Sequence, residues 1–200
     1  CTDKASLDSL KETILQRWGG VDIVIANGGD GRSAPDALPD EQQWERTWNN
    51  NFQSALLTAR TFLPMLQKSS GCLLFISSIT ALEAFGAPVD YSTAKTAVTA
   101  LAKNMARKLG GEVRVNVLAP GNVWFSGGVW DEKIKQNPER VKKMIESTVP
   151  MNRFGTTDEM ADVAVFICSE RASFITGSIL VVDGGETVWR DFDKRIKQSF

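Results

Sequence analysis

The chain has 200 residues, of which 42% are hydrophobic and 24% are charged, a composition typical of soluble globular proteins. Its 23 basic and 24 acidic residues give a net charge of −1, which argues against a nucleic-acid-binding or membrane-bound protein. The sequence contains no histidine, so Ser-His-Asp and Cys-His nucleophile systems and histidine-ligated metal sites are excluded, and we expect no metal.

The first half of the chain predicts two strands and two helical segments. Apolar residues recur at helical spacing over residues 6–19, where Thr2 or Asp3 would cap the helix and Gly19-Gly20 would end it. An apolar run over residues 22–26 predicts the first strand. A long helical stretch from about Asp40 to Gln67 follows, and residues 72–77 predict the second strand.

The second half repeats this alternation. A helix is predicted from Tyr91 to about Leu109, and strands over residues 114–118 and 178–182. Shorter helical segments lie between these two strands, at EKIKQ, VKKMIES and TDEMADVAVFICSE. Strands that alternate with helices predict an α/β fold, a doubly wound parallel sheet of about four strands with flanking helices.

The chain has three cysteines, Cys1, Cys72 and Cys168, and no C-x-x-C pair. This usage predicts reduced and mostly buried thiols and a cytoplasmic protein.

Tyr91 and Lys95 stand four residues apart in the sequence YSTAK. Residues at this spacing share one face of a helix, so the phenol and the ammonium can point into one site. A cation beside a phenol favours the phenolate and lowers its pKa toward neutrality, which suits a general acid or base. On this pentapeptide alone, an amphipathic helix with an unrelated Tyr and Lys is an equally good interpretation.

Residues suited to ligand binding follow each predicted strand, where ligands bind in doubly wound sheets. These residues are Ala26 to Gly29, Ser77 and Ser78, Pro120 to Asn122, and Asp183 to Gly185. Taken singly, each group is also typical of an ordinary turn or helix cap.

Together these groups resemble the short-chain dehydrogenase/reductase family from residue 1 to about Gly185. The family's Y-x-x-x-K matches Tyr91 and Lys95, and its serine, thirteen residues before the tyrosine, matches Ser78. Its helical asparagine matches Asn51 in NFQSALL. The family's N-N-A-G turn corresponds to A-N-G-G at residues 26–29, with Ala26 in its first position. Its P-G matches Pro120-Gly121, and its V-D-G-G matches residues 182–185.

The resemblance implies NAD(P)-dependent interconversion of a secondary alcohol and a ketone. Tyr91 would be the acid/base, and Ser78 would hydrogen-bond the substrate oxygen. Lys95 would lower the pKa of the tyrosine and bind the nicotinamide ribose, and Asn51 would anchor a proton-relaying water. The implied cofactor-binding residues are Asn27, Gly28, Gly29, Tyr91, Lys95, Pro120, Gly121 and Val123.

A rival motif overlaps the first, because Ser92-x-x-Lys95 matches the S-x-x-K of serine acylases. That chemistry requires S-D-N and K-T-G motifs, and neither occurs in the sequence.

The family's T-G-x-x-x-G-x-G turn, which seats the cofactor pyrophosphate, does not occur in the sequence. We therefore expect residues 1–185 to be the C-terminal part of a single Rossmann-like domain, with residues 186–200 as a C-terminal tail. The choice between NAD and NADP stays open, because the strand end that selects them would also lie outside the 200 residues. The alternative function is a non-catalytic binding or assembly subunit.

The segment NVWFSGGVWDEK stands where the family has its substrate-binding loop. Its aromatic residues, Trp124, Phe125 and Trp130, are either core or the lining of a pocket for an apolar or ring-bearing substrate. The resemblance also implies a homodimer or homotetramer, with Phe52, Leu56, Phe62, Val98, Leu101 and Met105 on the pairing helices and Trp189 and Phe192 adding a further contact.

Overall fold

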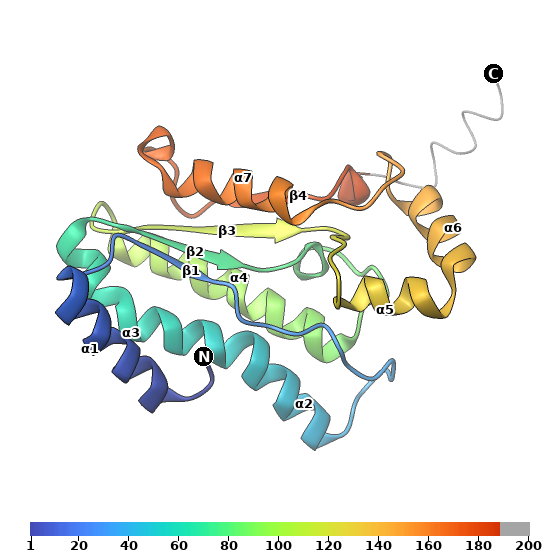
Figure 1. The fold of residues 1–200 in the computed structure, drawn as a ribbon, viewed down its shortest axis with the longest axis horizontal. Coiled ribbons are helices and arrows are strands. Elements are labelled where there is room, and N and C mark those ends of the chain that lie inside the picture. The colour runs from blue at the N-terminus through green and yellow to red at the C-terminus, as the bar shows by residue number, and fades with distance from the viewer. Residues whose placement is uncertain (189–200) are drawn as a thin grey trace.

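The computed structural model describes residues 1–188, and its centre is a parallel sheet of four strands (Figure 1). The strands are β1 (Ile23–Ala26), β2 (Cys72–Ile76), β3 (Arg114–Pro120) and β4 (Ile179–Val182), and they lie side by side in sequence order. All three pairings are parallel. The predicted α/β fold is confirmed, with each strand within two residues of its expected bounds.

Helices cover the two faces of this sheet unequally. On one face pack α1 (Lys4–Trp18), α3 (Ser54–Ser69) and α4 (Val89–Leu109), whereas α7 (Thr157–Cys168) lies on the other (Figure 1). Two short helices, α5 (Val129–Gln136) and α6 (Pro138–Thr148), lie beyond the carboxyl ends of the strands. Single 3₁₀ turns occupy Ile79–Ala81, Glu170–Ala172 and Glu186–Val188. Within residues 1–188, no helix is long and apolar enough to cross a bilayer.

The first helix begins and ends as its sequence predicts. The side chain of Asp3, rather than Thr2, accepts hydrogen bonds from the backbone N–H groups of Ala5 and Ser6. Gly19 ends the helix with a φ of 77°, a left-handed conformation that glycine adopts without steric cost.

The helical stretch predicted from residue 40 to residue 67 is divided into three parts. Helix α2 (Glu41–Trp48) is followed by a π-helical turn, Asn49–Gln53, and then by α3. A π turn carries an extra residue and rotates the side chains that follow it, and such turns are frequent at functional sites. Here the turn carries Asn51, whose side chain is buried at 1% exposure.

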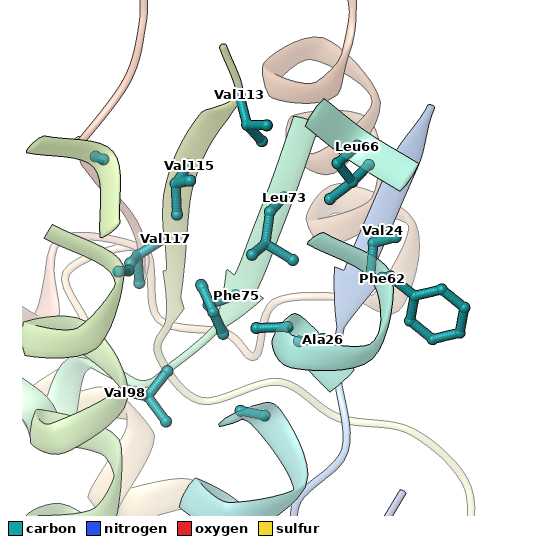
Figure 2. Close-up of a cluster of buried hydrophobic side chains, with 14 of the residues drawn as sticks. Val24, Ala26, Phe62, Leu66, Leu73, Phe75, Val98, Val113, Val115 and Val117 are labelled. Atoms are coloured by element: carbon teal, nitrogen blue, oxygen red, sulfur yellow. The ribbon is translucent and has the colours of Figure 1, made fainter. Parts of the chain in front are cut away.

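The main core lies between the sheet and the helices α1, α3 and α4. Figure 2 shows alternate side chains of β1, β2 and β3 pointing toward this face, where they meet residues of α3 and α4. Because successive strand residues point to opposite faces, each strand contributes every second residue to this core. The labelled members are Val24, Ala26, Phe62, Leu66, Leu73, Phe75, Val98, Val113, Val115 and Val117.

A second apolar cluster joins α7 to the opposite face of β2 and β3, and it brings two cysteines together. Cys72 of β2 and Cys168 of α7 are both buried, whereas Cys1 is exposed. A hydrogen bond between the two buried thiols lowers the pKa of Cys72 and raises that of Cys168. Residues 96 positions apart in sequence therefore meet in the core.

Arg114 fixes the end of α7 on the sheet. From β3 its guanidinium donates hydrogen bonds of 2.8–3.2 Å to the carbonyl oxygens of Ile167, Cys168, Ser169 and Ala172. These carbonyls belong to the last turn of α7 and the 3₁₀ turn after it, so the arginine supplies donors that the helix end lacks.

The same face of the sheet is open at β1. Ile23 is paired in register with Cys72 and Ile25 with Leu74, so both isoleucines lie on the face that α7 covers farther along the sheet. Each isoleucine is nevertheless 46% exposed. Strand β1 is also at one edge of the described sheet.

Candidate functional site

The carboxyl ends of the strands surround one large cavity of about 1210 Å³. Ligand sites in open α/β sheets lie at this edge. The lining includes most of the sequence-predicted site residues: Asn27, Gly29, Asn51, Ser78, Tyr91, Lys95, Pro120, Gly121, Val123, Phe125 and Trp130. Of the predicted residues, Gly28 and Trp124 do not line it. The cavity continues over the open face of β1, where Ile23 and Ile25 form part of its wall.

Tyr91 and Lys95 lie in the first half of α4 and face this cavity. The Lys95 Nζ atom is 5.7 Å from the centroid of the Tyr91 ring, as expected for residues one helical turn apart. Lys95 is only 5% exposed, and its ammonium donates a hydrogen bond of 3.1 Å to the carbonyl oxygen of Ile76 at the end of β2. The structure thus holds the predicted pair in one site.

Burial has the largest effect on the pKa values of both Tyr91 and Lys95. It lowers the pKa of Lys95 to about 8, because a buried ammonium loses its hydration. It also raises the pKa of Tyr91, where a hydrogen bond from Ser78 acts in the lowering direction and the negative charge of Asp30 acts in the raising direction. The sequence predicts that Lys95 lowers the pKa of Tyr91, but in the structure this pKa is raised, because desolvation has the largest effect.

Ser78 is oriented by a residue that sequence reasoning did not single out. Its Oγ atom accepts hydrogen bonds from the backbone N–H of Thr80, at 3.2 Å, and from the Thr80 hydroxyl, at 3.1 Å. A serine oxygen has two lone pairs, so these contacts occupy its acceptor capacity and leave its own proton to be donated. That O–H is free to interact with Tyr91 or with an oxygen bound beside it.

Asn51 joins the π-helical turn to the loop after β1. Its side-chain amide donates to the carbonyl oxygens of Asp30, at 2.9 Å, and Thr47, at 3.0 Å. Its Oδ1 atom accepts from the backbone N–H of Asp30 at 3.2 Å. Both amide protons are thus engaged with backbone, which fixes the loop against the floor of the cavity.

Two glycines allow the backbone to approach other groups closely. A Cβ atom on Gly29 would lie 2.7 Å from Asn51 Oδ1 and 3.0 Å from Lys95 Nζ. A Cβ atom on Gly121 would lie 2.7 Å from the Cα atom of Asp183. Side chains at these positions would displace the neighbouring site groups, which explains why the strand ends carry glycine.

A buried carboxylate precedes Tyr91 and was also missed from the sequence. Asp90 is 1% exposed and accepts hydrogen bonds from the Ser33 hydroxyl and from the backbone N–H of Tyr91. Burial acts to raise its pKa, but hydrogen bonds from Ser33, Thr47, the Tyr91 backbone and Gln43 outweigh burial and lower it. The start of α4 is thereby fastened to the loop after β1.

The predicted aromatic wall is only partly formed by the predicted residues. Phe125 and Trp130 line the cavity, and the Trp130 ring lies 5.5 Å from the ring of Phe154. The Lys133 ammonium lies 4.4 Å from the Trp130 ring centroid. The Trp124 side chain instead hydrogen-bonds to Asp131.

Glu186, which follows the V-D-G-G sequence, is a further titratable group in the cavity wall. It is 7% exposed and accepts a hydrogen bond of 2.9 Å from the side-chain amide of Asn122. Burial raises the pKa of Glu186 to about 7, against the opposing effect of the Asn122 hydrogen bond and with a further increase from Asp183. A carboxyl after a turn carries no sequence signal of this burial.

Known proteins resemble this chain along most of its length. A family model described as enoyl-(acyl carrier protein) reductase matches residues 1–187. The short-chain dehydrogenase/reductase SDRA of Arabidopsis thaliana is 34% identical over 180 residues, which are 88% of this chain and 68% of the relative. The chain belongs to the short-chain dehydrogenase/reductase family.

Two further similarities extend the family assignment. The 3-oxoacyl-[acyl-carrier-protein] reductase FabG of Thermotoga maritima is 28% identical over 186 residues, which are 92% of this chain and 73% of the relative. A 7α-hydroxysteroid dehydrogenase, solved with NADH and 7-oxo glycochenodeoxycholic acid, superposes with a TM-score of 0.82 at 28% identity, covering 92% of this chain and 71% of that protein. The family members named here are oxidoreductases.

Proposed function

We propose that this protein is an NAD(P)-dependent oxidoreductase that interconverts a secondary alcohol and a ketone, with Tyr91 as the acid/base. The observation that carries the proposal is the grouping of Ser78, Tyr91 and Lys95 on one cavity at the carboxyl ends of the strands. Asn51 completes the group through its contact with the loop after β1.

The proposed mechanism divides the reaction between a proton and a hydride. In the direction of reduction, the Tyr91 hydroxyl gives its proton to the carbonyl oxygen while the Ser78 O–H donates a hydrogen bond to the same oxygen. Lys95 is close enough to favour the phenolate left behind, and solvent restores the proton. The nicotinamide, when bound, supplies the hydride that reduces the carbonyl carbon. Oxidation of the alcohol runs the same steps in reverse.

The residues present fit the nicotinamide end of the cofactor. The close approach of Gly29 to Asn51 and Lys95 leaves open backbone beside the ammonium, where ribose hydroxyls would find donors and acceptors. Asn27, Pro120, Gly121 and Val123 line the neighbouring wall. Lys95, with its pKa of about 8, would bind the ribose hydroxyls as an ammonium at neutral pH.

The pyrophosphate end has no matching seat in these 200 residues, because the T-G-x-x-x-G-x-G sequence is absent. We propose that a further segment of the complete protein supplies it, pairs with the free edge of β1 and covers Ile23 and Ile25. The open apolar face beside β1 supports this proposal. The 200 residues alone are then expected to be poorly soluble and to show no measurable dinucleotide binding by calorimetry. Tight binding by this chain alone would contradict it.

The lining of the cavity supports a proposal for the substrate class. Phe125, Val129, Trp130 and Met144 line it, so an apolar or ring-bearing ketone would bury its body there while its oxygen meets Ser78 and Tyr91.

A homodimer or homotetramer through α3 and α4 is also proposed. Two of the residues expected at that interface, Phe62 and Val98, are instead buried in the core at 4% and 1% exposure. Phe52, Leu56, Leu101 and Met105 are only partly buried and carry the proposal. The expected contact through Trp189 and Phe192 lies outside the described residues. A monomeric mass at micromolar concentration would contradict the assembly.

The test of the proposed function is Tyr91→Phe in the complete protein, assayed against a panel of ring-bearing ketones with each nicotinamide cofactor. We expect turnover to fall by orders of magnitude while cofactor affinity and the unfolding transition stay unchanged, because only one oxygen is removed. Near-normal turnover of the phenylalanine variant would refute the assignment. An inactive wild-type protein that still binds the cofactor would favour the non-catalytic alternative.

A further inference from the structure

Arg32 joins two walls of the cavity that are far apart in sequence. It lies in the loop after β1, and its guanidinium contacts the Glu132 carboxylate of α5 through two hydrogen bonds, Nη2–Oε1 at 2.6 Å and Nε–Oε2 at 3.3 Å. The same Nη2 donates to the carbonyl oxygen of Gly127 at 3.1 Å. The loop after β1 and the segment 127–136 are therefore tied together across 100 residues of chain.

The tie lies at the rim of the proposed substrate site. Asp30, Gly31 and Arg32 line the cavity on one side, and Phe125 and Trp130 line it on the other. Within its own loop, the Arg32 Nη1 atom also contacts the Asp30 carboxylate, at 3.2 Å. This contact helps to orient the guanidinium. A movement of the segment 127–136 away from the loop would break the contacts to Glu132 and Gly127 and widen the cavity.

The contact between Arg32 and Glu132 is exposed to solvent. The side chains of Arg32 and Glu132 are 46% and 49% exposed, so water and salt compete for both charges. Exposed ion pairs contribute little to stability, and a bidentate pair mainly fixes geometry. Such a contact would favour the position of the segment 127–136 in which it is formed, while still allowing the segment to move away.

We propose that Arg32 and Glu132 form a latch that holds the segment 127–136 over the cavity, and that substrate enters and product leaves when this latch opens. The inference rests on the proposed function, because the cavity that the latch closes is the proposed substrate site. Arg32 and Glu132 act here by positioning the wall that carries Phe125 and Trp130, not by contacting the reacting atoms.

The chain offers a matched control pair away from the rim. Arg153 and Glu159 form a bidentate contact with distances of 2.6 Å and 2.9 Å, and their side chains are 46% and 40% exposed. They are only six positions apart in sequence, so this pair does not join distant walls. Glu159→Gln removes the charge while glutamine can keep the capping box at the start of α7.

The first experiment is hydrogen exchange by mass spectrometry on the complete protein without substrate. We expect Glu132→Gln to speed amide exchange over residues 127–136 by roughly threefold to fivefold, because an exposed ion pair shifts an opening equilibrium by about that factor. High salt should produce the same change in the wild type and none in the variant. Glu159→Gln should leave exchange over residues 127–136 as in the wild type. Unchanged exchange in Glu132→Gln would overturn the latch.

The second experiment is steady-state kinetics on the same variants. Because the latch holds the apolar wall and not the reacting atoms, Glu132→Gln should raise KM roughly threefold to fivefold without lowering kcat. The double variant Arg32→Gln/Glu132→Gln should raise KM no further than the larger single effect, as coupled partners require. A fall in kcat at constant KM would overturn the gating role. If the wild type is inactive, the proposed function fails, while the exchange result still decides the latch.

Discussion

Asn51 and Asp30 are held together by two hydrogen bonds that run in opposite directions. The Asn51 amide donates to the Asp30 carbonyl oxygen at 2.9 Å, and the Asp30 N–H donates to Asn51 Oδ1 at 3.2 Å. The asparagine thus acts as a clamp on the loop after β1, a role additional to the water relay that the family resemblance implies.

Because Asn51 holds this loop, we expect Asn51→Asp to lower the stability of the fold strongly. A carboxylate cannot donate, so the carbonyl oxygens of Asp30 and Thr47 would lose their partner in a buried place. We expect the free energy of unfolding to fall by about 2–4 kcal/mol, measured by urea denaturation. The control is Asn104→Asp, which removes a comparable i−4 hydrogen bond, to Ala100, from the exposed side of α4. Equal losses in the two variants would contradict the clamp.

Gly29→Ala tests the close approach in the cavity floor. The added methyl would lie 2.7 Å from Asn51 Oδ1 and 3.0 Å from Lys95 Nζ, so one of these groups must move. We expect weaker cofactor binding and at least a tenfold lower turnover in the complete protein, because catalysis is sensitive to small displacements. Gly20→Ala controls for the loss of backbone freedom, since no heavy atom lies within 4 Å of its added Cβ. Normal kinetics in Gly29→Ala would contradict this prediction, because Asn51 or Lys95 would then have moved without affecting turnover.

Tyr91 is the only tyrosine of these 200 residues, and the difference in ultraviolet absorbance between the complete protein and its Tyr91→Phe variant isolates its ionisation. The ultraviolet absorbance of the phenolate should rise only above the ordinary pKa of about 10, because burial raises the pKa of Tyr91. Lys95→Met should weaken cofactor binding in the complete protein, because it removes a donor to the ribose hydroxyls. It should leave the Tyr91 midpoint above 10, because Lys95, with its pKa of about 8, is already neutral where the phenol ionises. A midpoint below 10 in the wild type, or normal cofactor affinity in Lys95→Met, would contradict this account.

Glu186 predicts a dependence of stability on pH. Its pKa is about 7 in the folded chain and near the ordinary 4.5 when unfolded, so the folded state keeps a proton that the unfolded state releases. Its contribution therefore stabilises the fold below about pH 4.5 and is lost as the pH rises toward 7. Thermal melts should show Glu186→Gln gaining stability relative to the wild type over this range. The exposed Glu139→Gln should show no such trend.

Local patterns sufficed to predict the sheet and the common position of Tyr91, the proposed acid/base, and Lys95. The strands are short apolar runs, and the spacing of Tyr91 and Lys95 fixes their common face whatever surrounds the helix. The division of the stretch 40–67 by a π turn was not predictable, since the residues of Asn49–Gln53 also suit an α-helix. In that turn, Asn51 contacts Asp30 of the loop after β1, a long-range contact that the local pattern does not contain.

The pKa shifts and the ion pairs of the site could not be predicted from the sequence, because they depend on residues that only the fold brings together. The direction of the Tyr91 pKa depends on burial and on Asp30, 61 residues away, which the spacing of the motif does not contain. The Arg32–Glu132 contact likewise forms between segments 100 residues apart. Trp124 shows the same limit at short range, because an aromatic beside a site can turn toward Asp131 as readily as toward a substrate.

Because Cys72 of β2 is buried beneath α7, the rate at which its thiol reacts reports how often this part of the fold opens. A thiol reagent should label the exposed Cys1 at the rate of a free cysteine. Cys72, which is 1% exposed, can react only as often as α7 separates from β2, and the four hydrogen bonds from Arg114 oppose that separation. Counting labels by mass against time would therefore read out the lifting of a single helix without any engineered probe.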